Sequence, residues 1–413
     1  MKKLSALIVL ISAVHWLYAQ EKSLDYFLDR AIQSSPLLKD YQNQITSNRI
    51  DSMLLRANHG TKVDAFSAGT YAPVVNGWGY DQAITNVADV SAGLTASKEI
   101  TWKPYLDNQY LTLNYQRQYI DLNRKISKKD LQKSITSQYI SAYGNFKLYQ
   151  SNKEILAVLK QQDIIAKKLT EQGVIRQTEY LSLLVNLQKQ EMQVAQQLTQ
   201  YKNDLATLNL LCGISDTSSF GLVDPLLFPD SLFLPENTVF YQQFVLDSMQ
   251  LAANDARIDF DYKPKASLFV DGGYHSSFAF EPGKNVGVSA GISISVPIYD
   301  GHQRKMQHDK ISIQEKTRAY YREFFLNQNQ QHINMLWQQL GAINGLAAKA
   351  ARQADLAKAL VDADNKLMNS GDISVTEYIL AVNNYLDARN MLIRQTISKY
   401  QVINEINYWS SAK

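Results

Sequence analysis

Residues 90–100 read VSAGLTASKEI, and residues 288–298 read VSAGISISVPI. In the second stretch valine, alanine and isoleucine alternate with serine and glycine. A period of two residues predicts a β-strand with one apolar face and one polar face. A strand that crosses a membrane needs about 9–11 residues, with apolar side chains outside and polar ones inside. The alternation alone is equally typical of a two-sided sheet in a soluble domain, so other features have to decide.

The two faces of these strands differ in side-chain size as well as in polarity. We expect lipid to meet the apolar positions, which are Val90, Ala92, Leu94, Val288, Ala290, Ile292, Ile294 and Val296. The opposite positions hold serine, glycine and threonine, which suit a water-filled lumen better than a packed core. Tyr71 and Tyr274, at matching places in two further segments, would then belong to an aromatic girdle at the membrane interface.

The two stretches belong to an internal duplication. The second VSAG follows the first by 198 residues, and the same offset relates EQGVIRQTEYLSLLVNL (171–187) to NSGDISVTEYILAVNNY (369–385). In each copy 80 residues separate the glycine of VSAG from the glycine of this segment, which is Gly173 or Gly371. A third pair, KVDAFSAGTYAP and KASLFVDGGYHS, has an offset of 203. Matches in constant order and nearly constant spacing indicate that one unit occurs twice.

Long segments almost free of glycine and proline follow the strands of each copy. Residues 105–171 and 302–369 contain no proline and three glycines in all, which are Gly144, Gly341 and Gly345. Apolar residues recur in the first segment at spacings of three and four, as in helices that pack on other helices. About 66 helical residues span roughly 100 Å. Because a globular domain of this size is shorter, the segments predict an elongated bundle.

Each copy therefore predicts a leading helix, two strands, a long helix, a tight turn and a return helix. The first repeat, residues 20–212, is expected to comprise helices 23–33, 36–58, 105–171 and 176–211 and strands 62–72 and 88–100. The second repeat, residues 236–413, is expected to comprise helices 237–260, 302–369 and 374–409 and strands 265–275 and 286–298. The linker between them, residues 213–235, contains three prolines, which exclude a continuous helix.

The N-terminus and the composition bear on the class of protein. Two lysines, a short apolar run and Ala19 predict a signal peptide over residues 1–19, and the run is too short for a membrane-spanning helix. Without Lys2 and Lys3 the chain has 40 basic and 39 acidic residues, unlike a nucleic-acid-binding protein. Cys212 is the only cysteine, which excludes an intrachain disulfide, and its apolar neighbours predict that it is buried.

Four strands are too few to close a barrel in a membrane, because the smallest known barrels have about eight. Open strand edges in lipid would leave backbone groups without partners, at several kcal/mol each. If these strands are in a membrane, several chains must therefore contribute to one barrel. Two chains would supply eight strands and three would supply twelve, and the sequence does not choose between them.

The export signal, the duplication with two strands per copy, the long helices and the turn pattern G-x-x-x-x-T-E-Y-(I/L) resemble the TolC family of outer-membrane efflux proteins. The resemblance covers essentially the whole mature chain. It implies a mainly α-helical fold: a homotrimer with a twelve-stranded β-barrel in the outer membrane of a Gram-negative-type bacterium and a helical tunnel in the periplasm. It also implies passive conduction, in which an inner-membrane pump supplies the energy and a periplasmic adaptor joins the pump to this exit duct. By the same resemblance, the linker 213–235 would lie in an equatorial region of the tunnel.

The resemblance also gives roles to the two turns, which it places at the periplasmic tip. The residues that would contact the adaptor there are Gly173, Thr178, Tyr180, Gly371, Thr376 and Tyr378. In the family an acidic residue after the second glycine faces the narrowest part of the lumen. Glu377 has that position in this sequence, and Glu179 is its counterpart in the first repeat. Three copies of Glu377 around one axis would favour cations and resist anions.

Glu377 also has a purely structural interpretation. Ser374-Val375-Thr376-Glu377 is a capping box, in which the glutamate binds a backbone N–H of the helix start whether or not it gates a channel. Glu179 lacks the matching serine, because Arg176 stands in its place. The family's second acidic residue and its tip arginine are replaced by Leu380 and Ile373, so a closed tip would need other contacts.

Two other function classes compete with a channel. An enzyme is disfavoured because no HExxH, GxSxG or P-loop pattern occurs, and we expect neither cofactor nor metal. His302 and His308 are six residues apart and share no helical face, so we interpret them as isolated surface histidines. An exported trimeric stalk or adhesin-like structural protein would explain the long helices, but it needs neither the small polar strand face nor the duplicated turns. The exported substrate is not encoded, because a duct carries what its pump delivers.

Overall fold

The computed structural model describes residues 21–80, 87–216, 220–230, 235–278, 281–370 and 372–410. The signal peptide expected over residues 1–19 lies outside the described residues, as do Gly371 and parts of the expected linker. The chain forms two compact units. Unit 1 comprises Met1–Lys39, Arg124–Val239 and Phe325–Lys413, and unit 2 comprises Asp40–Asn123 and Phe240–Phe324. Each unit therefore contains segments of both repeats.

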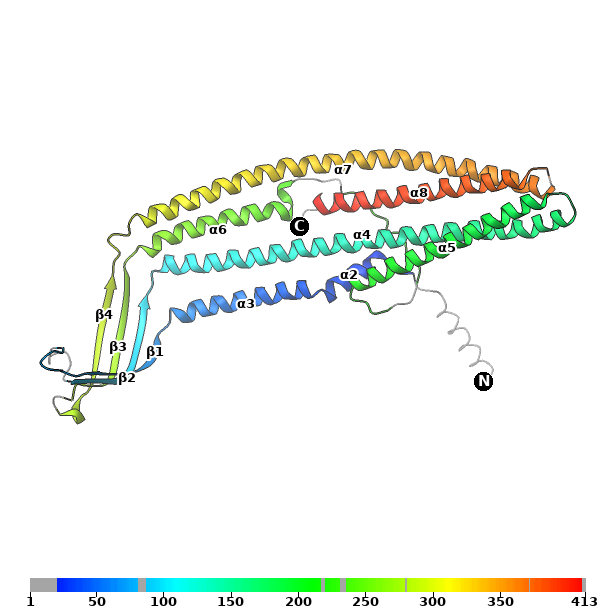
Figure 1. The fold of residues 1–413 in the computed structure, drawn as a ribbon. Coiled ribbons are helices and arrows are strands. Elements are labelled where there is room, and N and C mark those ends of the chain that lie inside the picture. Colours follow the sequence, from blue (N-terminus) through cyan, green and yellow to red (C-terminus); the bar gives the residue numbers. More distant parts are fainter. Residues whose placement is uncertain are drawn as a thin grey trace, which may run out of the picture. The chain divides into compact units, whose positions relative to one another are not determined.

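Helices make up most of the described chain (Figure 1). Their bounds are α2 Leu24–Ser34, α3 Pro36–Asn58, α4 Lys103–Glu171, α5 Gln177–Leu211, α6 Val239–Asp261, α7 Gln303–Ser370 and α8 Val375–Ser410. Two short 3₁₀ helices cover Pro235–Asn237 and Pro282–Lys284. The segments expected as long helices, 105–171 and 302–369, correspond to α4 and α7 within two residues at each end. None of the described helices combines the length and apolarity needed to cross a membrane.

A tight turn follows each long helix. At the first turn Gly173 has a φ of +73°, a left-handed conformation that glycine adopts without steric cost. The amide of Val174 donates to the carbonyl of Leu169 at 2.9 Å, so a carbonyl that the helix end would leave free is satisfied. At the second turn the amide of Asp372 donates to the carbonyl of Leu367, also at 2.9 Å. The two repeats thus end their long helices with the same type of bond.

Unit 2 contains one antiparallel sheet of four strands in the order β1-β2-β3-β4. The strands are β1 Lys62–Ala72, β2 Val87–Ile100, β3 Lys265–Ser276 and β4 Val286–Ser295. β2 of the first repeat pairs with β3 of the second, which joins the two copies in one sheet. β1 and β4 are its edges.

The end of β4 corrects one expectation. The strand was expected to reach residue 298, but it ends at Ser295, so Val296 is not a strand residue. Pro297 gives the reason, because proline has no N–H for a ladder hydrogen bond and restricts the residue before it. Val296 therefore does not belong to the apolar face of the sheet.

Unit 1 is held together by three apolar clusters. The first joins α2, α4, α5 and the linker and is centred on Phe27, Ile135, Tyr139, Tyr201 and Leu208. The second lies near the turns and includes Leu183, Met368, Val375 and Tyr378. The third joins α7 to α8 through Leu336, Ile343, Ile403 and Ile406. Cys212 is buried in the first cluster, as its apolar neighbours predicted, and burial raises the pKa of its thiol to about 12.

Candidate functional site

The strand register sorts the side chains of the sheet into two faces. Leu94 of β2 lies opposite Gly272 of β3, and Gly272 lies opposite Val288 of β4. Directly opposed residues share a face. One face therefore carries the expected lipid-facing residues that lie within strands, which are Val90, Ala92, Leu94, Val288, Ala290, Ile292 and Ile294. Val288 is 81% exposed and Ile294 is 64% exposed, so nothing in the described chain covers this apolar face.

The opposite face is polar and hydrogen-bonded across three strands. Thr95 Oγ1 donates to Asp271 Oδ1 at 2.6 Å, and Ser289 Oγ donates to Asp271 Oδ2 at 3.4 Å. Asp64 of β1 lies opposite Thr95, so one row across the sheet carries two carboxylates and two hydroxyls. This row is suited to contact with water.

Two phenylalanines also lie on the polar face, each over a glycine of the neighbouring strand. Phe66 pairs with Gly93, and Phe269 pairs with Gly291. A Cβ atom at Gly93 would come within 3.1 Å of the Phe66 ring, and one at Gly291 within 2.3 Å of the Phe269 ring. Phe66 and Phe269 are the fifth residues of KVDAF and KASLF, so the duplicated segments contained this signal. Alternation along one strand does not reveal this pairing, because it does not fix the register between strands.

The first turn presents its expected contact residues differently from the second. Gly173 and Thr178 are exposed, whereas Glu179 and Tyr180 are half-buried. Burial, together with a hydrogen bond to Asp163 of α4, raises the pKa of the Tyr180 hydroxyl. The N-cap of α5, Arg176, has no side-chain capping bond. In this turn Tyr180 therefore ties the return helix to the long helix.

The second turn contains the capping box that its sequence predicts. The amide of Glu377 donates to Ser374 Oγ at 3.2 Å, and the amide of Ser374 donates to Glu377 Oε2 at 3.1 Å. The Glu377 side chain is nevertheless exposed, as is Thr376. Tyr378 is fully buried, so it supports the turn from inside instead of offering a contact surface. Glu377 thus caps α8 and leaves its carboxylate open to solvent.

Tyrosines fasten the linker to the helices of unit 1. The hydroxyl of Tyr139 donates to the carbonyls of Val223 at 2.7 Å and Lys22 at 3.0 Å. Tyr143 and Tyr400 donate to the two carboxylate oxygens of Asp224. Burial raises the pKa of Tyr139, so its hydroxyl stays protonated as a donor. The proline-containing linker is thereby fixed at defined points.

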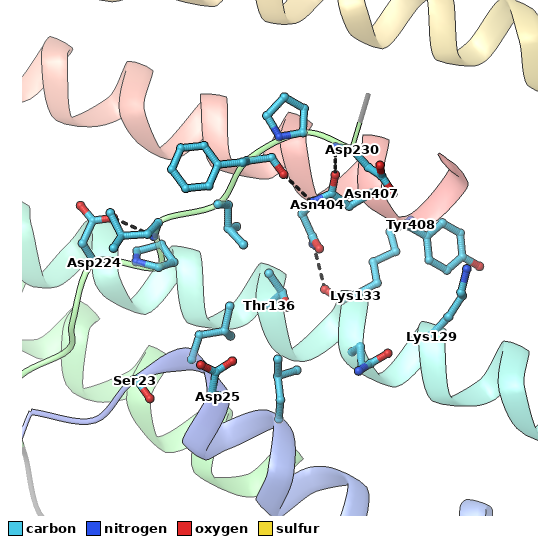
Figure 2. Close-up of a pocket in the computed structure, with 18 of the residues that line it drawn as sticks. Ser23, Asp25, Lys129, Lys133, Thr136, Asp224, Asp230, Asn404, Asn407 and Tyr408 are labelled. Atoms are coloured by element: carbon cyan, nitrogen blue, oxygen red, sulfur yellow. Dashed lines mark hydrogen bonds between the residues drawn. The ribbon is translucent and has the colours of Figure 1, made fainter. Parts of the chain in front are cut away.

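A groove of about 960 Å³ lies between this linker, α2, α4 and α8 (Figure 2). Figure 2 shows Asn407 of α8 bridging the linker: its amide donates to the Phe228 carbonyl at 2.9 Å and accepts from the Asp230 amide at 2.7 Å. Lys133, which also lines the groove, forms an ion pair with Glu405 at 2.8 Å. Asn407 and Lys133 are thus already engaged by other groups of the chain.

In unit 2, a charged cluster links α6 to the start of α7. His308 Nδ1 lies 2.7 Å from Asp255 Oδ1, and His308 Nε2 lies 3.1 Å from Asp259 Oδ1. Arg304 contacts Asp259 at 2.7 Å. Both ring nitrogens can donate only in the charged imidazolium, and the bond to Asp255 is the main cause of the raised pKa of His308. The interpretation of His308 as an isolated surface histidine was wrong, because pairing across two helices cannot be read from spacing along one.

Among the residues that the structure describes, no group of three or more histidine, cysteine, aspartate or glutamate side chains is arranged to hold a metal ion.

The fold matches solved structures of outer-membrane channels over nearly its whole length. The structure of CusC has a TM-score of 0.75 and 14% identity, covering 96% of this chain and 94% of that chain. The outer membrane protein VceC of Vibrio cholerae has a TM-score of 0.75 and 12% identity, covering 94% of this chain and 97% of that chain. The open state of the MtrE outer membrane channel of Neisseria gonorrhoeae gives 0.74 and 13%, covering 94% and 88%. No family model and no curated protein matches the sequence.

At these identities the likeness concerns the fold. The chain has the fold of the TolC family of outer-membrane efflux channels, with long helical hairpins and four strands in one sheet. The fold class predicted from the duplication, the strand alternation and the turn pattern is thereby confirmed. The structures that share the fold are channel proteins.

Proposed function

We propose that this chain is the outer-membrane exit duct of a tripartite efflux or type I-like export system. It conducts substrates passively from an inner-membrane pump through the periplasm to the outside. The sheet carries the proposal: four strands with one exposed apolar face and one hydrogen-bonded polar face are what a segment of a water-filled membrane barrel requires. The structural neighbours, which are described as outer membrane channels, support the same role.

The proposal requires association of several chains. The outer edges of β1 and β4 offer backbone N–H and C=O groups that must find partners in lipid. Three chains with four strands each would close a twelve-stranded barrel, and the resemblance to the TolC family favours this homotrimer over a dimer. The apolar face would then meet outer-membrane lipid, and the row of Asp64, Thr95, Asp271 and Ser289 would face the lumen.

The helical turns are the proposed contact region for a periplasmic adaptor, which would connect the duct to its pump. The exposed positions Gly173, Thr178 and Thr376 are available for this contact. The exposed carboxylate of Glu377 is the proposed constriction residue, with the half-buried Glu179 as a weaker candidate. Three Glu377 carboxylates near one axis would lower the energy of cations there and raise that of anions.

The proposed domain organisation follows the duplication. Residues 1–19 would be removed on export, residues 20–212 and 236–413 would each supply half of the strands and helices, and residues 213–235 would link the repeats. The helical part would lie in the periplasm of a Gram-negative-type cell. This organisation needs no cofactor and no catalytic residue.

Reconstitution in planar lipid bilayers tests the proposal. Purified full-length mature chain should form trimers in detergent and give stepwise conductance in the bilayer. The alternative, an exported helical stalk, fits the long helices but predicts no conductance steps. A water-soluble monomer in the absence of detergent would contradict the channel, because its apolar face would then need no lipid.

A further inference from the structure

We infer that the helix-side margin of the sheet, centred on Lys98 and Trp102, binds the phosphate groups of anionic phospholipids. The inference rests on the proposed function, because it requires the apolar face of the sheet to meet lipid. It adds a specific partner, the headgroup layer of the leaflet on the helix side, and it identifies the residues that bind this layer. We name these residues the headgroup margin: Lys98, Ile100, Trp102, Lys103 and Lys263.

Lys98 is a lysine on the apolar face. It lies opposite Leu268, and Leu268 lies opposite Ile292, so the three side chains share the face that carries the lipid-facing residues. The next residue, Glu99, lies opposite Ser267 and therefore on the polar face, and it forms no ion pair with Lys98. A lysine at the end of an apolar face can bury its methylene stem and extend its ammonium group to the membrane surface.

Trp102 lies at the same end of the sheet as Lys98, just after the end of β2. Its side chain is 56% exposed, and its indole Nε1 donates to the carbonyl of Pro264 at 3.0 Å, just before β3 begins. The bond fixes the ring across the ends of two neighbouring strands. Tryptophan is enriched where hydrocarbon meets headgroups, because its apolar ring and polar N–H suit the two sides. A ring that is both exposed and held in place is suited to anchor a sheet at one depth.

The charges of the headgroup margin lack acidic partners. Lys98, Lys103 and Lys263 are all exposed, and in the described part of the chain none of them takes part in an ion pair. Lys263 instead lies over the Phe260 ring at 5.0 Å. At the other end of the sheet Lys284 forms an ion pair with Glu281 at 2.7 Å, and His275 Nε2 lies 2.9 Å from Asp89 Oδ1. The contrast between the two ends indicates an external anion at the helix side.

The position of the margin favours phospholipid over other anions. α4 begins at Lys103, directly after Trp102, so this end of the sheet adjoins the helices that the proposed function assigns to the periplasm. The leaflet facing the periplasm consists of phospholipids, and lysines near a surface with acidic lipids are attracted to it. A second copy of the chain could also cover the apolar face. Its own headgroup margin would then place further lysines beside those of the first copy, and like charges repel.

The experiment compares lipid binding by detergent-solubilised full-length variants. Wild type is compared with the triple variant K98Q/K103Q/K263Q and with a matched control, K349Q/K358Q/K366Q on α7, which loses three positive charges like the triple variant. Each is titrated with phosphatidylglycerol or phosphatidylcholine and followed by native mass spectrometry and by the thermal unfolding midpoint. A fourth variant, K98R/K103R/K263R, restores the charges.

We expect wild type, the control and the arginine variant to retain phosphatidylglycerol and to gain thermal stability from it. The glutamine triple variant should bind it at least about ten-fold more weakly, and phosphatidylcholine should not distinguish the variants. Equal binding by the triple variant and the control would overturn the inference, as would a change in oligomer number confined to the triple variant. Conductance of the same samples separates the proposals: pores without a lipid preference contradict only this inference, and absence of pores contradicts the proposed function.

Discussion

Asp224 accepts hydrogen bonds from two helices at once: Tyr143 of α4 donates to Oδ2 at 2.9 Å, and Tyr400 of α8 donates to Oδ1 at 2.6 Å. The amide of Leu226 adds a third bond to Oδ1 at 3.0 Å. Burial opposes ionisation of this carboxyl, but the three donors prevail and hold its pKa below the ordinary value. The linker between the repeats is therefore fixed to the bundle by an ionised side chain.

Replacement of Asp224 should weaken this attachment. We expect D224N to lower the free energy of unfolding by about 1–2 kcal/mol at neutral pH, because a charged acceptor of three bonds becomes a neutral one. The thermal unfolding midpoint by circular dichroism measures the effect. D29N, which changes an exposed carboxylate on α2, is the matched control and should unfold like wild type.

The same carboxylate predicts a pH dependence with a definite sign. Because the folded pKa is depressed, the stabilisation is present above 3.8, the ordinary value, and is lost as the pH falls toward the folded pKa. The difference between wild type and D224N should therefore be constant near neutral pH and shrink in acid below about pH 4. A difference that grows in acid would mean that Asp224 is not ionised in the folded state.

The glycines of the polar sheet face offer a graded series. A Cβ atom at Gly273 would meet backbone, the Ala92 oxygen at 2.3 Å, whereas one at Gly291 would meet the movable ring of Phe269. At Gly287 it would meet nothing within 4 Å. We expect G273A to impair folding of the sheet most, G291A less, and G287A not at all, as judged by the yield of detergent-stable oligomer. F269A should rescue G291A but not G273A.

Glu377 allows its structural and electrostatic roles to be separated by one pair of variants. Glutamine preserves a capping box and removes the charge, whereas alanine removes both. If Glu377 lines the constriction, E377Q should reduce the cation preference of the reconstituted channel as much as E377A, measured by reversal potentials in a salt gradient. Only E377A should lower the thermal midpoint, since it removes the bond from the Ser374 amide to the side chain of residue 377, while Ser374 Oγ still caps the helix. Reversal potentials that stay at the wild-type value in both variants would leave Glu377 a cap alone.

The sequence predicted the regular elements well because duplication gave each pattern twice. Strand alternation, glycine-poor helices and the tight turn at Gly173 depend on nearby residues, and all three are present in the structure. β4 was expected to reach residue 298, because apolar residues continue to alternate there. It ends at Ser295 instead, because Pro297 cannot donate a ladder hydrogen bond. Local patterns therefore located the elements but did not give the residue at which β4 ends.

Contacts between distant segments were not predictable in the same way. The bonds to Asp224 join residues 81 and 176 positions apart, and no spacing rule relates them. The cross-strand pair of Phe269 and Gly291 depends on register, which alternation alone does not fix. His308 was misread for the same reason, because its partners Asp255 and Asp259 lie on another helix.

His308 gives the last prediction. Its imidazolium is held between Asp255 and Asp259, and Asp259 also binds Arg304, while Asp300 and Tyr262 lie beside Arg304. The folded pKa is raised, so the stabilisation is fully present below 6.5, the ordinary value, and is lost as the pH rises through the folded pKa.

We expect wild type to lose thermal stability between mildly acidic and mildly alkaline pH, and H308Q to show a flatter profile, because glutamine can bridge the carboxylates without titrating. H302Q is the control, since His302 forms no ion pair among the described residues. Thermal midpoints measured in steps from pH 5.5 to about 9 check this. If H308Q and wild type kept parallel profiles over that range, the cluster between α6 and α7 would not depend on a charged histidine.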